Sequence, residues 1–212
     1  MTNPEAFDER KARQQFVRDR QKIVFTIMIA LLAVVLVVAF LFYFGVLGKS
    51  ATTMAAEKPN YGVTAPCATT DGTGTAKSVA AGSVSVRVLN ATGKAGLADA
   101  VSESLVNRGF TAKGVANYPG TKTFERTEIR FGKNGINQAY TLAGHFNDAI
   151  LRMDDRADKL VDVIIGSTFS NLVDEDSVKT GTDQELTSIQ NCVSPDQIKN
   201  LPSAVQHDAV TK

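Results

Sequence analysis

The 212-residue sequence contains two cysteines and two histidines, residue types that often bind metal ions or take part in catalysis. Cys67 and Cys192 stand apart, with no histidine near either of them, and isolated cysteines make a poor zinc site. His145 and His207 have no recognisable nucleophile, base or orienting acid near them in sequence. We therefore expect no catalytic residue, no metal site and no cofactor, and we expect His145 to face water.

A glycine-rich turn is the candidate ligand-binding element. It comprises Asn90, Thr92, Gly93, Lys94 and Gly96, and it precedes a stretch with helical periodicity. Free N–H groups at the start of a helix bind anions, and the lysine adds positive charge, so the turn is a candidate phosphate site. A structural interpretation is also open, in which the polar side chains satisfy local backbone groups and the glycines ease the turn.

Two arginines mark a second candidate surface. Arg87 and Arg130 alternate with apolar residues in predicted strands, so they should lie on the sheet face turned away from the helices. An open face of this kind can bind an extended polymer through polar contacts, although a merely solvated face explains the pattern as well. Tyr118 and Phe124, in the predicted loop over 117–125, are exposed anchors for a partner, part of the core, or cover for the sheet edge.

An uncharged apolar run precedes all of these elements. Residues 23–48 contain no charged side chain and, at ~1.5 Å per residue, exceed the ~30 Å hydrocarbon core of a membrane. Positive charge collects before the run, so residues 1–22 are predicted to be cytoplasmic and residues 49–212 extracytoplasmic, in a single-pass protein of the cell membrane. The alternative is a cleaved signal peptide, whose apolar segment has only ~7–15 residues.

This topology places both cysteines where disulfides form, and we predict that Cys67 pairs with Cys192. The bond would tie the segment before the folded domain to the segment after it. The near-neutral balance of 23 Lys and Arg against 22 Asp and Glu argues against nucleic acid as a partner. Membrane lipid, in contact with the apolar run, is the expected partner of the N-terminal part.

Alternation and helical periodicity predict one folded domain between two irregular segments. We expect a flexible stalk over 49–82, the domain over 83–173 and a C-terminal extension over 174–212 that frays beyond Pro202. The predicted strands cover 83–90, 110–115, 127–131 and 161–165, and the predicted helices cover 96–108 and 136–153.

The predicted order of elements is β-α-β-β-α-β, which indicates an α/β fold. Strands that alternate in polarity need cover on one face only, so we expect a two-layer α+β sandwich with both helices on the same face. A split-βαβ arrangement is the first hypothesis for the sheet.

Three stretches of the predicted domain resemble the LytR/CpsA/Psr C-terminal (LytR_C) domain family. They are VRVLNATGKAGLADAVSESLVNRGFTAKGVAN, TEIRFGKNGINQAYTLAGHF and VDVIIGSTFSNL. The most specific part is Leu89–Gly93 followed by Gly96, although the family commonly has glycine where this chain has Ala91. The resemblance implies a non-catalytic, membrane-anchored cell-envelope integrity factor. Its expected partners are peptidoglycan or another wall polymer, or wall-assembly enzymes such as the LytR/CpsA/Psr enzymes.

Two other functions stay open. One is an enzyme, or an accessory subunit, of glycopolymer transfer to peptidoglycan, which would need acids and arginines clustered in a pocket. The other is a peptidoglycan-binding module of the sporulation-related repeat type, which shares the predicted element order. The transferase domain of LytR/CpsA/Psr enzymes has no room between the predicted stalk and the predicted LytR_C domain, so its active site has no counterpart here.

Overall fold

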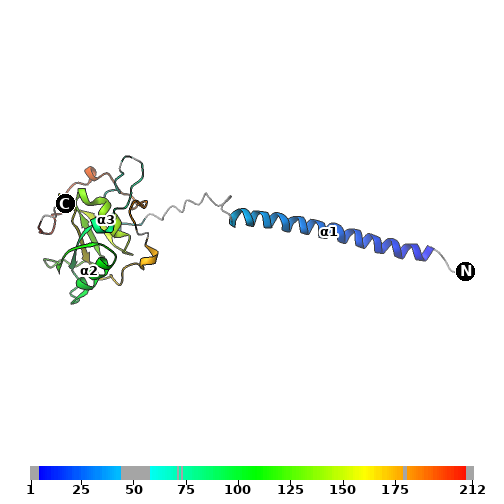
Figure 1. Ribbon diagram of the computed structural model, residues 1–212, viewed down its shortest axis with the longest axis horizontal. Helices are drawn as coiled ribbons and strands as arrows, with labels where there is room; N and C mark the ends of the chain where they lie inside the picture. Colours follow the sequence, from blue (N-terminus) through cyan, green and yellow to red (C-terminus); the bar gives the residue numbers. More distant parts are fainter. Residues whose placement is uncertain (1–4, 44–57, 71, 73, 179–180, 209–212) are drawn as a thin grey trace. The chain divides into compact units, whose positions relative to one another are not determined.

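The chain consists of an N-terminal unit, Met1–Met54, and a second unit, Ala55–Lys212. The computed structural model describes residues 5–43, 58–70, 72, 74–178 and 181–208 (Figure 1). In the first unit the helix α1 (Glu5–Tyr43) contains an apolar segment, Gln21–Phe40, that is long enough to cross a membrane. The predicted apolar helix is therefore confirmed, while residues 44–48 of the predicted span lie outside the described residues.

A five-stranded mixed sheet with two helices forms the centre of the second unit (Figure 1). Its elements are β1 (Ser85–Asn90), α2 (Leu97–Asn107), β2 (Thr111–Asn117), β3 (Glu128–Phe131), α3 (Ile136–Ala143), β4 (Ile150–Met153) and β5 (Val161–Ile165). Short 3-10 helices lie at Ala81–Ser83, Lys133–Gly135, Glu175–Ser177 and Pro195–Gln197. The spatial order is β2-β1-β5-β3-β4, in which β3 and β5 are antiparallel and the other neighbours are parallel. The predicted α/β class is confirmed.

Both helices pack on one face of the sheet, as predicted. Each helix connects two parallel neighbouring strands, α2 from β1 to β2 and α3 from β3 to β4. The strands of the first β-α-β connection are antiparallel to those of the second, and the two connections lead to opposite edges of the sheet. Right-handed crossovers then place both helices on the same side. On that side Val86, Ile129 and Val163 from the strands share one buried core with Leu105 and Ala139 from the helices.

The sheet has one strand more than predicted. The helix predicted over 136–153 ends at Ala143, and its last residues form β4. The prediction was wrong because the spacing of Phe146 and Ile150 fits a helix, whereas pairing with β3 buries Leu151 and Met153 in the core. The split-βαβ hypothesis was also wrong, since β1 and β2 are direct neighbours with no strand between them.

Much of the predicted stalk packs against the domain instead of forming a flexible linker. Ala65 is fully buried, and Ala76 and Ser78 are also buried. The Asn60 side chain donates to the Leu151 carbonyl at 2.9 Å and accepts from its N–H at 2.8 Å. The sequence did not indicate this packing because the segment has no periodicity and docks as irregular chain. Residues 49–57 lie outside the described part of the chain.

The C-terminal extension is tied to this incoming segment. Cys67 and Cys192 form the predicted disulfide, with Cα atoms 4.8 Å apart. Beside it the Cys67 N–H donates to the Val193 carbonyl at 2.9 Å. Ordered chain continues past Pro202, where fraying was expected, because Ala204 N–H donates to the carboxylate of Asp155 at 2.7 Å.

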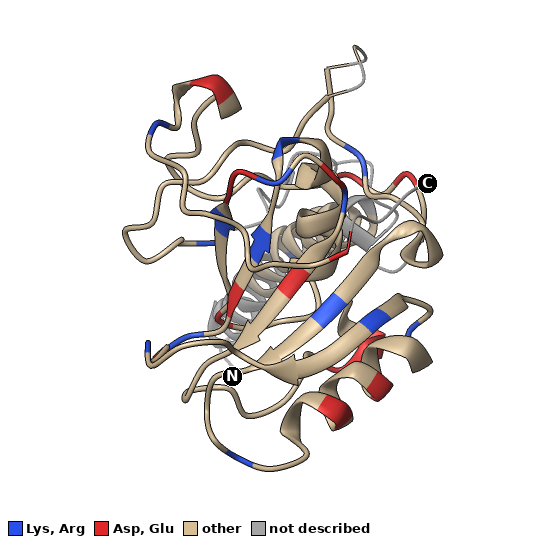
Figure 2. Ribbon diagram, turned by 90° about the vertical axis from the view of Figure 1, so that its left-hand side faces the viewer, with Lys and Arg blue, Asp and Glu red and all other residues tan. Residues whose placement is uncertain are grey.

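The sheet face opposite the helices carries charged positions side by side on neighbouring strands (Figure 2). Arg87 on β1 and Arg130 on β3 are both register partners of Asp162 on β5. Residues 205–206 lie over this face, since their carbonyls accept hydrogen bonds from Arg87. The middle of the sheet is therefore covered on both sides, by helices on one and by irregular chain on the other, whereas the edge strand β2 is mostly exposed.

Candidate functional site

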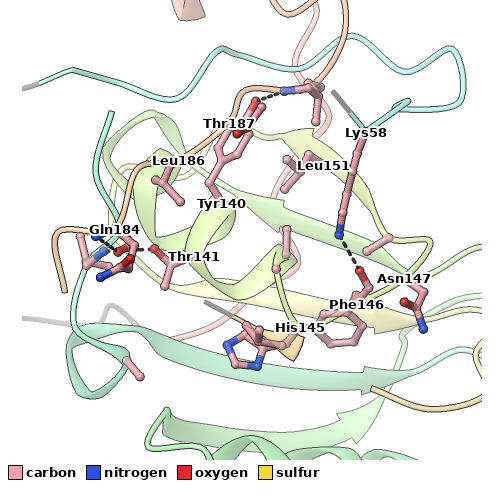
Figure 3. Close-up of a pocket in the computed structure, with 18 of the residues that line it drawn as sticks. Lys58, Tyr140, Thr141, His145, Phe146, Asn147, Leu151, Gln184, Leu186 and Thr187 are labelled. Carbon is pink, nitrogen blue, oxygen red and sulfur yellow. Dashed lines mark hydrogen bonds between the residues drawn. The ribbon is translucent and has the colours of Figure 1, made fainter. Parts of the chain in front are cut away.

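A cavity of about 320 Å³ lies beside the C-terminal end of α3 (Figure 3). Its walls come from parts of the chain that are distant in sequence: segments 58–61 and 78–81, the domain at 108–110 and 140–151, and the extension at 177–178 and 181–189. Pockets for small ligands typically measure ~300–1,000 Å³. The disulfide joins the incoming segment to the extension, so it also ties together two walls of this cavity.

The lining is mainly apolar. Phe146, Leu151 and Leu186 surround the cavity together with the ring of Tyr140 (Figure 3). The Tyr140 hydroxyl donates to the Pro66 carbonyl at 2.8 Å. Burial raises the pKa of Tyr140, so the phenol stays neutral and its ring forms a fixed apolar wall.

Two cations at the cavity lack an acidic partner among the described residues. Lys58 Nζ donates to the Phe146 carbonyl at 3.2 Å, and Arg108 Nη1 lies 3.1 Å from Nδ1 of His145. The acid among the described lining residues is Glu185, which is exposed. Lys58 and Arg108 therefore contact two consecutive residues of the cavity wall, whose lining also includes polar side chains such as Gln184.

His145 is buried, at 4 % exposure, instead of facing water as predicted. Its ring packs edge-to-face against Phe110 with centroids 4.9 Å apart. Burial, assisted by the charge of Arg108, lowers the pKa of His145 to about 4, so the imidazole is neutral at pH 7. Arginine only donates, so Nδ1 accepts and Nε2 carries the proton. The prediction was wrong because α3 ends at Ala143, and the helical wheel does not extend to His145.

The predicted anion turn is closed by its own hydrogen bonds. Asn90 Oδ1 accepts from the N–H of Thr92 at 3.0 Å and from its hydroxyl at 2.8 Å. Asn90 Nδ2 donates to the Lys94 carbonyl at 2.7 Å, and Gly93 and Gly96 have φ values of 75° and 73°. These bonds favour the structural interpretation of the turn, while anion binding stays a prediction.

A polar hollow of about 400 Å³ lies beside this turn, where β1 and β2 end. Its lining includes the amides of Asn90 and Asn117, the hydroxyl of Thr121, the ring of Tyr118 and the cation Lys122. Such a mixture of hydrogen-bonding groups around an aromatic ring differs in character from the apolar cavity at α3. The molecule thus offers two candidate binding sites with different chemistry.

The two arginines of the predicted polymer-facing surface lie on the expected face but are engaged by protein groups. Arg87 donates twice to the Asp162 carboxylate, at 2.8 and 2.7 Å, and also to the backbone carbonyls of 205–206. Arg130 is buried and donates to Glu128 at 3.1 and 3.0 Å. The face is covered where we expected it to be open, and polymer binding there stays an untested prediction.

Tyr118 and Phe124 form part of a small core on this same face. Their rings meet edge-to-face with centroids 4.7 Å apart. Phe124 is buried with Leu89 and Ile164, and the guanidinium of Arg130 lies 5.5 Å from the centre of its ring. Of the three interpretations of these aromatic residues, the structure supports core packing.

Asp162 is the centre of a buried ion-pair network that the sequence did not reveal. It accepts from Arg87 and, at 2.8 Å, from Arg156, whose side chain is only 1 % exposed. Arg156 also donates to Asp154 at 2.8 and 2.6 Å. Burial opposes the charge of Arg156, but the hydrogen bonds and charges of the two carboxylates raise its pKa above the usual value. An acid inside the apolar run VDVII was the available signal.

The part of the chain that contains the sheet and its two helices is similar to known proteins. Residues 83–169 match the family described as "LytR_C: LytR cell envelope-related transcriptional attenuator". The cell envelope integrity protein Cei of Mycobacterium tuberculosis is 35% identical over 96 residues, which are 44% of this chain and 44% of that protein. The chain thus spans less than half the length of this curated relative.

A solved structure is also similar in sequence. It is the soluble domain of a conserved hypothetical secreted protein from Mycobacterium marinum, with 33% identity over 47% of this chain and 70% of that one, and a TM-score of 0.43. The family match contains the five strands of the sheet, both sheet-packed helices and the glycine-rich turn. It contains neither cysteine, nor the cavity walls at 58–61, 177–178 and 181–189. Residues 83–169 of this chain are therefore similar to the LytR_C family.

Proposed function

We propose that this protein is a non-catalytic, membrane-anchored cell-envelope integrity factor whose outer domain binds wall polymer or holds wall-building enzymes in place. The observation that carries the proposal is one chain that combines a helix of membrane-crossing length with a LytR_C domain similar to Cei. A helix of this kind confines the domain to a membrane surface, and the family and its relative associate such domains with the cell envelope.

The proposed orientation has the N-terminus in the cytoplasm and the domain outside. Positive residues concentrate before the apolar helix, and the disulfide suits an oxidising compartment. Fusions after Lys212 test this orientation directly. Alkaline phosphatase, which is active only outside, should give activity, whereas a fluorescent protein that matures only in the cytoplasm should stay dark. The reverse result would overturn the topology and the envelope role together.

The polar hollow beside the glycine-rich turn is the surface that we assign to wall polymer. Lys94 in the turn and Lys122 in the hollow form no ion pair within the part of the chain that the structure describes. Amide and hydroxyl groups beside an aromatic ring suit a sugar chain, and unpaired lysines suit a polymer that carries phosphates.

Co-sedimentation with purified cell-wall sacculi tests this assignment. The full chain, held in detergent-free lipid nanodiscs, should sediment with sacculi and be released by salt, because exposed charge pairs are screened. The double variant Lys94→Ala/Lys122→Ala should bind several-fold more weakly, while Lys113→Ala, an exposed lysine on β2 outside the hollow, should bind normally. Equal binding by both variants would reject the hollow as the polymer site.

The wall-enzyme alternative has its own measurement. Crosslinking of the full chain in living cells, followed by mass spectrometry, should recover either glycan fragments or an enzyme of wall assembly. Deletion of the gene should sensitise cells to detergents and wall-directed antibiotics. Intact resistance in the deletion strain would contradict an envelope-integrity role.

A further inference from the structure

We propose that the cavity beside α3 binds a single long-chain anionic amphiphile, with its acyl or prenyl chain in the apolar part and its carboxylate or phosphate head against Lys58 and Arg108. This ligand site goes beyond the proposed function. Binding of wall polymer or of wall enzymes would stand even if the cavity took no ligand.

The apolar part of the cavity is suited to a hydrocarbon chain. Phe146 and Leu151 are fully buried in the domain, and Leu186 closes the opposite side from the extension. The cavity measures about 320 Å³ and is open to solvent, since Lys58 and Glu185 in its lining are exposed, so a ligand can reach its buried walls. Its apolar walls favour a hydrophobic occupant over water, and its size admits one chain.

The charged end selects an anionic head. On the sheet face, the arginines at 87, 130 and 156 all contact carboxylates. At the cavity, by contrast, Lys58 has a backbone carbonyl as its acceptor and Arg108 has the ring nitrogen of His145. A lysine has three donors and an arginine five, so most of these donors remain for a ligand. One carboxylate or phosphate group would accept charge-assisted hydrogen bonds from the free donors of both side chains.

Neutral His145 completes this end of the cavity. Its Nδ1 accepts from Arg108, and its protonated Nε2 has no hydrogen-bond partner among the described residues. The site therefore presents donors from two cations and one neutral ring, and among the described lining residues Glu185, which is exposed, is the acid that could repel an anion.

The position of the cavity in the sequence favours lipid as the source. Only residues 44–57 separate the end of the apolar helix from Lys58, the first residue of the cavity. A protein anchored in a bilayer meets single-chain anionic lipids at higher local concentration than soluble anions of similar size. We therefore commit to a membrane-derived amphiphile and not to a free phosphate ion.

Photocrosslinking of the full chain tests the proposal. The chain is held in detergent-free lipid nanodiscs and exposed to palmitate that carries a diazirine in its chain, with the matching long-chain alcohol as the neutral probe. We expect palmitate to label peptides from 140–151 and 181–189, in addition to α1, which contacts lipid in any case. Labelling by palmitate should exceed labelling by the alcohol about tenfold, which corresponds to ~1.4 kcal/mol.

Variants test separately the site for the hydrocarbon tail of the ligand and the site for its anionic head. Leu186→Arg should abolish labelling of the cavity peptides while labelling of α1 persists as the internal standard. Lys58→Gln/Arg108→Gln, at one exposed and one partly exposed position, should reduce palmitate labelling to the level of the alcohol. Lys113→Gln, on β2, should match the natural chain. Sedimentation of all variants with sacculi should be unchanged, so failure of this inference can be told from failure of the proposed function.

Several results would overturn the inference. Labelling confined to α1 would mean that the cavity does not bind the hydrocarbon tail of palmitate. Equal labelling by palmitate and the alcohol, or normal palmitate labelling in the double glutamine variant, would remove the anionic head. Displacement of palmitate by millimolar inorganic phosphate would reduce the site to an ion site. If Leu186→Arg loses its native thermal transition, the double glutamine variant decides the question alone.

Discussion

Replacing Asp162 by alanine should cost far more stability than removing any exposed acid of the domain. The Asp162 carboxylate is fully buried and accepts hydrogen bonds from Arg87 and Arg156. Arg156 is 1 % exposed, so after the substitution its charge stays in the interior with Asp154 as its remaining acidic partner. Breaking a buried ion pair by removing one partner typically costs ~3–5 kcal/mol.

The structure places Asp162→Ala near the lower end of that range. Arg156 keeps two hydrogen bonds to Asp154, and Arg87 is at the edge of the network and reaches backbone carbonyls as well. We therefore expect a loss of ~3 kcal/mol in the free energy of unfolding. For a domain of this size, ~1 kcal/mol shifts Tm by ~2–4 °C, so Tm should fall by ~6–12 °C.

The matched control is Asp196→Ala. Asp196 pairs with Lys133 at 2.6 Å, a shorter contact than the buried pair of Asp162 with Arg156, but the two side chains are 77% and 61% exposed. Exposed pairs contribute ~0–1 kcal/mol, so this substitution should shift Tm by no more than ~4 °C.

Thermal unfolding of the full chain is measured in mild detergent with the disulfide intact. The protein has no tryptophan, and three of its four tyrosines lie in the second unit, so the near-UV circular dichroism of tyrosine reports mainly on that unit. Similar losses for Asp162→Ala and Asp196→Ala would refute the reasoning, since burial and not distance is held to decide the cost.

Other predictions concern pH, the disulfide and one glycine. The pKa of His145 is about 4 when folded and ~6.5 when unfolded, so stability is complete above pH ~6.5 and falls by at most ~3 kcal/mol as pH drops toward 4. In urea titrations His145→Gln should flatten that dependence, and an unchanged slope would contradict it. Cys67→Ser/Cys192→Ser should lower the free energy of unfolding by ~4–5 kcal/mol, as the bond closes a loop with a sequence separation of 125; an unchanged urea midpoint would reject this estimate. Gly132→Ala should cost ~1–3 kcal/mol, because its Cβ would collide with the Arg156 carbonyl, and an unaltered Tm would show that the chain there yields easily.

Patterns of neighbouring residues in the sequence predicted several helices and strands of the fold. The uncharged run predicted α1, and the alternation around Val86 and Val88 predicted β1. The stripe that contains Val101 and Leu105 predicted α2, and the two isolated cysteines predicted their own pairing. Each helix or strand of this kind is encoded within a short stretch of residues. The disulfide was predicted because the predicted membrane topology places both cysteines in an oxidising compartment.

Features that depend on distant partners could not be predicted in the same way. β4 exists because it pairs with β3, and the segment around Ala65 is ordered because it docks on a finished domain. The cavity needs segments from before, within and after the predicted domain to converge, and neither Lys58 nor Arg108 stands out in sequence. The signal that was available was the disulfide, since a bond between the incoming segment and the extension implies that both wrap the same domain.

The disulfide and the chain that it joins also define where this protein can be cut. The family boundaries at 83 and 169 would remove Ala65, Ala76 and Ile189 from the shared core, together with the segment that covers Leu89 on the far side of the sheet. Such a minimal fragment would expose apolar surface on both faces and should aggregate. A fragment for crystallisation or drug screening should instead run from the residues just before Lys58 to at least Asp208, so that the domain carries its own wrapping with it.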